Sequence, residues 1–231
     1  MENNEIREIC KEYGIGDYFI NDDGSIDVGS SVDLSNFQLT HIPLKFNIVE
    51  GSFWINSNKL ETLENSPNYV RYDFNCSNNP NLDSLKGCPE YVGSSFNCSY
   101  NFLDSLEYVP EVVDTLDVTH NDIKSFKSNI KKIKRKLIAK HNQIMDLYDL
   151  DPNIINPGCI IDISFNPIHS LFLDGININY IEWFNSIKPV RNDEVSLRRL
   201  KYMLSSIKGE SVVIDDTHIN LIKRHYKISN F

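Results

Sequence analysis

A phrase of about 21 residues recurs along this sequence and constrains its fold more than any other feature. Each copy has an apolar residue, any residue, a second apolar residue, two further positions, an asparagine, and soon afterwards a leucine or isoleucine. Repeats with a period of about 20 to 50 residues are typical of solenoid folds, because one copy cannot bury its apolar face alone. The asparagines follow one another at steps of 20 to 24 residues: Asn58, Asn79, Asn101, Asn121, Asn142 and Asn166.

A seventh copy precedes these six, and one copy is irregular. In the first copy, Val32, Leu34 and Leu39 keep the pattern, but Phe37 occupies the asparagine position. The copy at Asn79 carries one extra residue before its leucine. Copies in nearly constant phase predict about seven coils stacked into one solenoid.

The phrase matches the leucine-rich-repeat consensus LxxLxLxxNxL from its second apolar position onward. The apolar pair predicts a short strand with one inward face, so stacked copies form a parallel sheet along one side. The asparagine stands where the chain leaves the strand, and its amide can bond unpaired backbone groups or another asparagine. We therefore expect an α/β solenoid of the leucine-rich-repeat class.

The return path of each coil is expected to be irregular. A second inward column follows the asparagine turn, and prolines recur after that column. Proline has no N–H donor, so it favours irregular or short helical turns on the outer side. The column is Leu63, Leu85, Leu106 and Phe126, and the prolines are Pro67, Pro89 and Pro110.

Caps are expected at both ends, because the terminal coils would otherwise expose apolar faces. Residues 2–13 carry apolar residues at helical spacing, and residues 18–28 predict a hairpin with an Asp-Asp-Gly turn. The resulting division is an N-terminal cap at 1–28 and a solenoid at 29–174.

The C-terminal segment, 175–231, is expected to be a helical cap. One helix is predicted over 178–187. A second has Asp193 as its N-cap, and a third has Asp215 or Asp216. A separate effector module is the alternative, although about 55 residues is small for an independent domain.

The composition excludes several classes of function. A formal net charge of −9 argues against general nucleic-acid binding, and no apolar run approaches the length of a membrane-spanning helix. The polar, acidic start is unlike a secretory signal, so we expect a cytoplasmic location. Five cysteines without a CxxC pair favour buried thiols over a disulfide or metal site, and no cofactor is expected.

The residue between the two apolar positions of each strand is expected to face outward on the exposed, concave side of the sheet. Most residues of this column are small and polar, as a solvated face requires. Trp54 differs, because exposed tryptophan is typical of binding hot spots unless the N-terminal cap covers it. The candidate partner-binding column is Asp33, Trp54, Asn75, Asn97, Asp117, Ile138 and Asp162.

A column of rings is a second candidate site. Tyr100, His120, His141 and Phe165 each precede the repeat asparagine, so they are expected to stack along one edge of the sheet. Two stacked histidines could bind a metal ion, but no carboxylate or cysteine shares their column. The sequence therefore favours a simple edge stack, with no metal.

A basic stretch at 124–140 is a third candidate site. It holds eight basic residues and no acidic ones. Such a stretch suits an acidic partner or phosphate groups, or else a solvated outer face. The candidate residues are Lys131, Lys132, Lys134, Arg135 and Lys136.

Catalytic motifs are missing from the sequence. GxSxG, GxxxxGKS, HExxH and GxGxxG do not occur, and no cysteine follows Cys159. We therefore expect a protein that is not an enzyme.

The doubled phrase FNCSNNPNLDSLKGCPEYVGSSFNCSYNFLDSLEYVPEVV, at 74–113, resembles a known repeat. It is similar to the FxCSxNxLxSLxGxPxxVGGxF repeats of leucine-rich-repeat proteins encoded by large tailed bacteriophages. The likeness is close over 9–113 and weakens through Asp174. It implies a leucine-rich-repeat fold, expression in an infected bacterial cell and no known catalytic residues.

These features together predict a non-enzymatic protein-interaction module. As a phage accessory protein, it would bind and inhibit a host protein, such as a component of anti-phage defence. The alternative is a structural or assembly component of the virion. Copies five to seven depart from the repeat, which indicates either a specific surface or simple divergence. A homodimer, paired through open edges or helical caps, is also compatible with the sequence.

Overall fold

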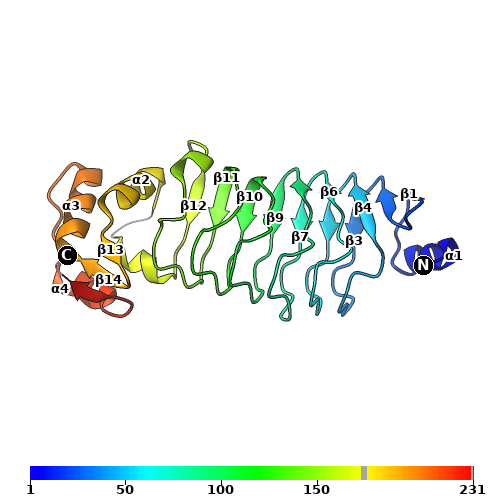
Figure 1. The fold of residues 1–231 in the computed structure, drawn as a ribbon, viewed down its shortest axis with the longest axis horizontal. Helices are drawn as coiled ribbons and strands as arrows, with labels where there is room; N and C mark the ends of the chain where they lie inside the picture. Colours follow the sequence, from blue (N-terminus) through cyan, green and yellow to red (C-terminus); the bar gives the residue numbers. More distant parts are fainter. Residues whose placement is uncertain (173–175, 230) are drawn as a thin grey trace.

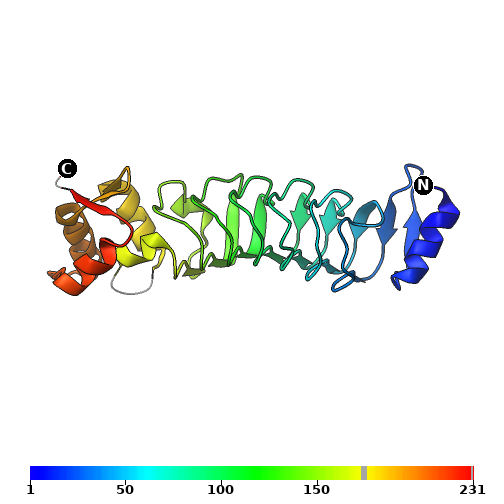
Figure 2. The ribbon, with the colours of Figure 1, turned by 90° about the horizontal axis from the view of Figure 1, so that it is seen from below.

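The computed structural model describes residues 1–172, 176–229 and 231, and it is a parallel β-solenoid. Figure 1 and Figure 2 show the coils side by side in a nearly straight rod, without the expected concave curvature. Among the described residues, the front sheet has one strand from each of seven coils, which confirms the predicted solenoid. The strands are β3 (Val32–Asp33), β5 (Phe53–Trp54), β7 (Phe74–Asn75), β9 (Ser95–Asn97), β10 (Val112–Asp117), β11 (Lys132–Ile138) and β12 (Ile160–Asp162).

A second sheet runs beside the front sheet, and the sequence did not predict it. Its strands are parallel except for the terminal β1–β2 hairpin. The prolines after the inward column stand two residues before a strand, where a missing N–H is tolerated, so the prediction of irregular or helical turns there is wrong. The strands are β1 (Tyr18–Ile20), β2 (Ile26–Val28), β4 (Phe46–Val49), β6 (Tyr69–Val70) and β8 (Tyr91–Val92).

Adjacent coils approach so closely between the two sheets that some positions accept only glycine. A Cβ atom on Gly93 would lie 2.0 Å from the carbonyl oxygen of Arg71 in the preceding coil. A Cβ atom on Gly51 would lie 2.4 Å from the backbone nitrogen of Ser31. These glycines therefore set the coil-to-coil spacing of the N-terminal half.

The core consists of columns of stacked side chains. The rings of Phe53 and Phe74 are stacked with centroids 6.0 Å apart, and Phe74 stacks on Phe96 at 5.3 Å. Cys76 and Cys98 are fully buried free thiols, as predicted, and burial raises their pKa well above its usual value.

Six buried asparagines join each coil to the one before it. Asn121 Nδ2 donates to the carbonyl oxygen of Val118 in its own coil and to that of Cys98 in the preceding coil, both at 3.0 Å. Asn121 Oδ1 accepts from the backbone N–H of Leu103 at 3.0 Å. The carbonyl pattern recurs at Asn58, Asn79, Asn101, Asn142 and Asn166.

These asparagines bond backbone groups, as the sequence predicted. Among the described residues they do not bond one another's side chains. Asn101 differs from the other asparagines in one contact, since its Oδ1 accepts from the backbone N–H of Asn79. Asn79 belongs to the coil that has one extra residue before its leucine.

The N-terminal helix explains the missing asparagine of the first coil. Helix α1 (Asn3–Glu12) begins after a capping box between Glu2 and Glu5 and covers the end of the solenoid. An asparagine in the first coil would have no earlier coil to bond. Phe37 instead packs edge-on against Tyr13 at the end of the helix, with ring centroids 5.1 Å apart.

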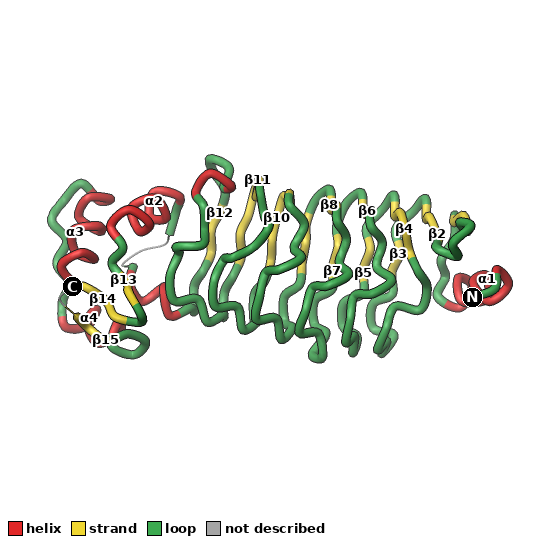
Figure 3. The backbone as a smooth tube through the Cα atoms, viewed as in Figure 1, coloured by secondary structure: helices red, strands yellow, loops and turns green. Residues whose placement is uncertain are grey.

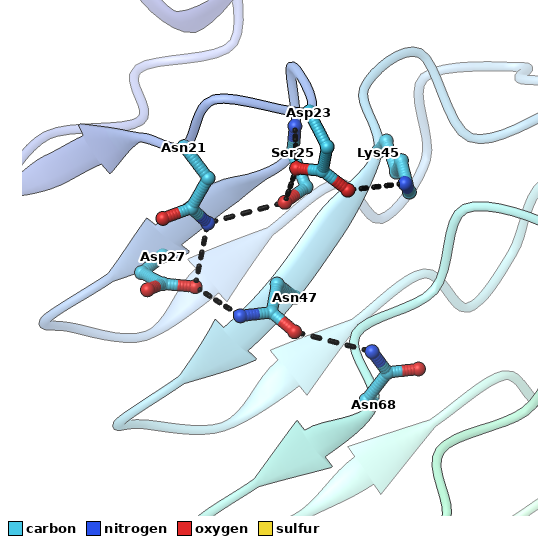
Figure 4. A network of polar contacts seen from close by, with 7 residues as sticks. All are labelled: Asn21, Asp23, Ser25, Asp27, Lys45, Asn47 and Asn68. Atoms are coloured by element: carbon cyan, nitrogen blue, oxygen red, sulfur yellow. Dashed lines mark hydrogen bonds and ion pairs between the residues drawn. The ribbon is translucent and has the colours of Figure 1, made fainter.

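A network of polar side chains fastens the β1–β2 hairpin to the next strands of the second sheet (Figure 4). Asp27 Oδ1 accepts from Asn21 Nδ2 at 3.2 Å and from Asn47 Nδ2 at 2.8 Å. Asn68 Nδ2 then donates to Asn47 Oδ1 at 3.1 Å. The network therefore spans the cap and the next two coils, and it also includes Asp23, Ser25 and Lys45.

The C-terminal segment packs helices beside a small sheet, as Figure 3 shows. The helix predicted over 178–187 is confirmed, and Asp215 caps α4 as predicted. Asp193 does not cap a helix, because it lies in a hairpin turn and Ser196 is the N-cap of α3. The elements of this segment are α2 (Ile178–Ile187), β13 (Val190–Arg191), β14 (Glu194–Ser196), α3 (Leu197–Lys208), α4 (Asp216–Ile222) and β15 (Lys227–Ser229). Two short 3-10 helices, η1 (Pro152–Ile154) and η2 (Pro167–Leu171), precede it in the last coils of the solenoid.

The expected boundary between the solenoid and the C-terminal segment, at 174/175, lies outside the described residues.

Candidate protein-interaction surface

The seven residues of the predicted outward column lie side by side across the front sheet. Backbone register pairs each one directly with the next, and all are at least partly exposed. The geometric part of the prediction is therefore confirmed for Asp33, Trp54, Asn75, Asn97, Asp117, Ile138 and Asp162.

Five of these seven side chains have a structural task in their own coil. Each Asp or Asn accepts a hydrogen bond from the backbone N–H two residues later, at 2.9 to 3.1 Å. Such bonds hold the chain as it turns out of the strand. The residues concerned are Asp33, Asn75, Asn97, Asp117 and Asp162.

Trp54 and Ile138 are the exceptions in this column. Neither side chain can accept the turn bond, so two coils have an apolar residue where the others use a turn former. Both are half-buried. The turn chemistry does not explain these two residues, which makes them better candidates for contact with another molecule than their neighbours.

The four predicted ring residues form a continuous stack, the aromatic ladder (Tyr100, His120, His141 and Phe165). Successive ring centroids are 4.4, 4.1 and 4.2 Å apart, and the planes differ by at most 20°. The stack lies at the surface, where Tyr100 is 55% exposed and Phe165 is 67% exposed.

The ladder occupies backbone positions that do not favour rings. All four residues have φ between 51° and 59°. The N–H groups of the first three bond the next coil, as Tyr100 does to the carbonyl oxygen of Thr119 at 2.8 Å. The equivalent residues of the first three coils, Asn36, Ser57 and Asn78, share this left-handed geometry. Asparagine and histidine adopt it readily, whereas tyrosine and phenylalanine rarely do. The turn geometry therefore does not account for Tyr100 and Phe165.

Stacking also affects the charge of the ladder. Loss of hydration lowers the pKa of His120, and the charge of neighbouring His141 lowers it further. Since the two imidazole planes differ by only 10° and the ring centroids are 4.1 Å apart, the in-plane lone pairs of the ring nitrogens lie in nearly parallel planes and do not converge on one ion.

Much of the basic stretch is neutralised by the preceding coil. Lys131 pairs with Glu111 at 2.7 Å, while Lys134 and Arg135 both pair with Asp114, at 2.8 and 3.3 Å. The other two candidate residues, Lys132 and Lys136, form no ion pair with any described residue. The prediction of one continuous basic patch is therefore too simple.

An apolar and basic cluster lies on the front sheet of the last two coils. Lys136 stands beside Ile160 in the strand register, and Ile160 is 57% exposed. Ile138 follows on β11, and the ring of His141 stacks on Phe165. These five residues are named the docking face: Lys136, Ile138, His141, Ile160 and Phe165.

Two exposed features were missed by sequence reasoning. Ile160 could have been found, because it stands two positions before Asp162 in the outward register. Tyr69 and Tyr91 stack on the second sheet with centroids 4.8 Å apart and planes 4° apart. Their stacking had no sequence signal, because the second sheet was not predicted.

Within residues 1–172, 176–229 and 231, no cluster of three or more His, Cys, Asp or Glu side chains is arranged to hold a metal ion. No helix in the described part of the chain has the length and apolarity needed to cross a bilayer.

Comparison with known proteins gives no match to a family model, a curated protein or a solved structure.

Proposed function

We propose that this protein is a non-enzymatic protein-interaction module that binds its partner through the docking face. The observation that carries the proposal is the aromatic ladder, which places rings at left-handed surface positions where the first three coils have asparagine or serine. For Tyr100 and Phe165, such a position costs about 1 kcal/mol or more relative to asparagine or glycine. Contact with a partner gives these rings a use that offsets the cost.

The composition of the docking face suits a protein partner. Large exposed aromatic and aliphatic side chains are typical of interface centres and charged side chains of the surrounding rim, whereas small polar side chains are typical of solvated sheets. At the register position of Lys136 and Ile160, the preceding coils have Ser95 and Thr115. On the last two coils a cation and an apolar side chain thus replace small polar side chains. This replacement favours a partner with an apolar surface bordered by carboxylates.

The class of partner follows from the resemblance to phage-encoded repeats. Under this proposal, the protein acts in the cytoplasm of an infected bacterium, binds a host protein and blocks its action. A component of anti-phage defence fits such a role.

The test is affinity capture of host proteins from a lysate of infected bacterial cells, with the purified chain as bait. Calorimetry with the purified partner then measures the affinity. The variant Ile160→Ser, Phe165→Asn removes the two most exposed apolar side chains of the docking face, and asparagine at position 165 tolerates the positive φ there. Tyr91→Asn removes an exposed ring from the second sheet and serves as the matched control. We expect binding at least tenfold weaker for the first variant and unchanged for the second.

Two outcomes would contradict the proposal. Equal affinity of both variants would place the interface elsewhere on the molecule. Recovery of the protein from purified virions at a fixed stoichiometry, with no captured host protein, would favour the virion component. The single variant Trp54→Ala tests the other end of the front sheet, which should not affect binding through the docking face.

A further inference from the structure

A cleft of about 700 Å³ lies where the sixth coil meets the C-terminal segment. Asp146 and Tyr148 line it from the solenoid, and Lys188 and Arg191 line it from the segment between α2 and β14. Volumes of about 300 to 1,000 Å³ at junctions between structural units are typical of small-molecule sites.

The wall formed by residues 187–191 is held by distant side chains. The Tyr148 hydroxyl donates to the carbonyl oxygen of Val190 at 2.6 Å and accepts from its N–H at 3.2 Å. Arg199 Nη1 donates to the carbonyl oxygens of Ile187 and Lys188, at 3.3 and 3.4 Å. This segment is therefore fixed before any ligand arrives, which lowers the entropy cost of binding.

The two cations on this wall are also positioned. Lys188 ends α2 with φ 52°, a left-handed position where glycine is the usual residue. The Arg191 guanidinium lies 5.1 Å from the ring centre of Phe231, which restricts the directions it can take. Neither cation forms an ion pair with any residue that the structure describes.

The solenoid side of the cleft carries a half-buried carboxylate. Asp146 accepts from the backbone N–H of Tyr148 at 3.0 Å and has no cation within ion-pair distance among the described residues. Burial raises its pKa, and the charges of Asp149 and Asp193 raise it further. A positive group that enters the cleft would therefore be stabilised by this carboxylate.

We propose that this cleft binds a small zwitterion that carries an ammonium and a carboxylate group, such as a free α-amino acid. The ammonium bonds Asp146, and the carboxylate bonds the Arg191 guanidinium, with Lys188 adding positive charge. The Tyr148 ring offers an apolar wall for the rest of the ligand. This site is separate from the docking face.

The test is calorimetry or ligand-observed NMR with the purified full chain and a panel of free α-amino acids. Acetate and methylamine serve as probes that carry only one of the two charges. We expect at least one amino acid to bind at least tenfold more tightly than either probe. Asp146→Asn and Arg191→Gln should each weaken this binding at least tenfold.

Matched variants outside the cleft are Asp122→Asn and Arg198→Gln, which make the same chemical changes at exposed positions. They should leave binding unchanged. The proposal is overturned if no amino acid binds at millimolar concentration, if acetate binds equally well, or if the cleft and control variants behave alike. Circular dichroism of each variant checks that lost binding does not reflect lost folding.

Discussion

The regular coils, residues 53–109, and the later coils, residues 112–171, share one backbone plan but differ on their surface. Both use buried asparagines to bond the preceding coil, and both have a left-handed residue before that asparagine. In the regular coils the outward positions of the front sheet are mostly small and polar. In the later coils they include Lys136, Ile138 and Ile160, and every left-handed position before the asparagine holds a ring, whereas the regular coils have Ser57, Asn78 and Tyr100 there. The difference indicates that scaffold and surface are separable in this fold.

The largest expected effect tests the close approach of the regular coils. Gly93→Ala places a Cβ 2.0 Å from the carbonyl oxygen of Arg71, so the coils must separate. We expect a loss of about 3 kcal/mol in the free energy of unfolding, measured by urea denaturation. Gly16→Ala is the control, because its Cβ would have no neighbour within 4 Å. Similar stability of the two variants would show that the spacing is not set by glycine.

An intermediate effect tests whether the scaffold is the same in both regions. Asn79→Ala and Asn142→Ala each remove an amide that bonds two coils and leave buried backbone groups unpaired. We expect each to lower the free energy of unfolding by about 2 to 3 kcal/mol. Asn129→Ala is the control, since its side chain makes no hydrogen bond with a described residue. A much smaller loss at Asn142 than at Asn79 would break the equivalence of the two regions.

The smallest effect distinguishes the later coils, whose left-handed positions hold two histidines, His120 and His141. The pKa of His120 is lowered in the folded state, so the stability that this residue contributes is present above about pH 6.5, the usual histidine value. It is lost as the pH falls through the lowered pKa. The variant His141→Asn removes one of the two causes of the lowered pKa, the charge of His141. It should therefore raise the pKa of His120, as measured by NMR titration. An unchanged pKa would mean that His141 has no part in the shift.

Much of the solenoid could be predicted from sequence because the repeat specifies it locally. Each coil is identified by its apolar pair, its asparagine and the leucine that follows. Cys76 and Cys98 occupy an apolar position of that pair, so their burial could be predicted. The second sheet could not be predicted in this way. Tyr69–Val70 and Tyr91–Val92 are strands only because equivalent residues of neighbouring coils lie beside them.

The candidate surface was predicted only in part, and the reason is again the contact between coils. The column of seven residues and the aromatic ladder follow from the period of the repeat. The ion pairs of the basic stretch do not follow from that period, because Glu111 and Asp114 lie about 20 residues before their partners and outside the stretch.

The sequence by itself determined the period, the core columns and the asparagine contacts, because each depends on residue type at a fixed spacing. The tertiary structure alone decided which charges are neutralised, which rings stay exposed and where the cleft beside Asp146 lies. Those properties depend on distances between residues far apart in the chain, such as Tyr148 and Val190, and no local pattern encodes them.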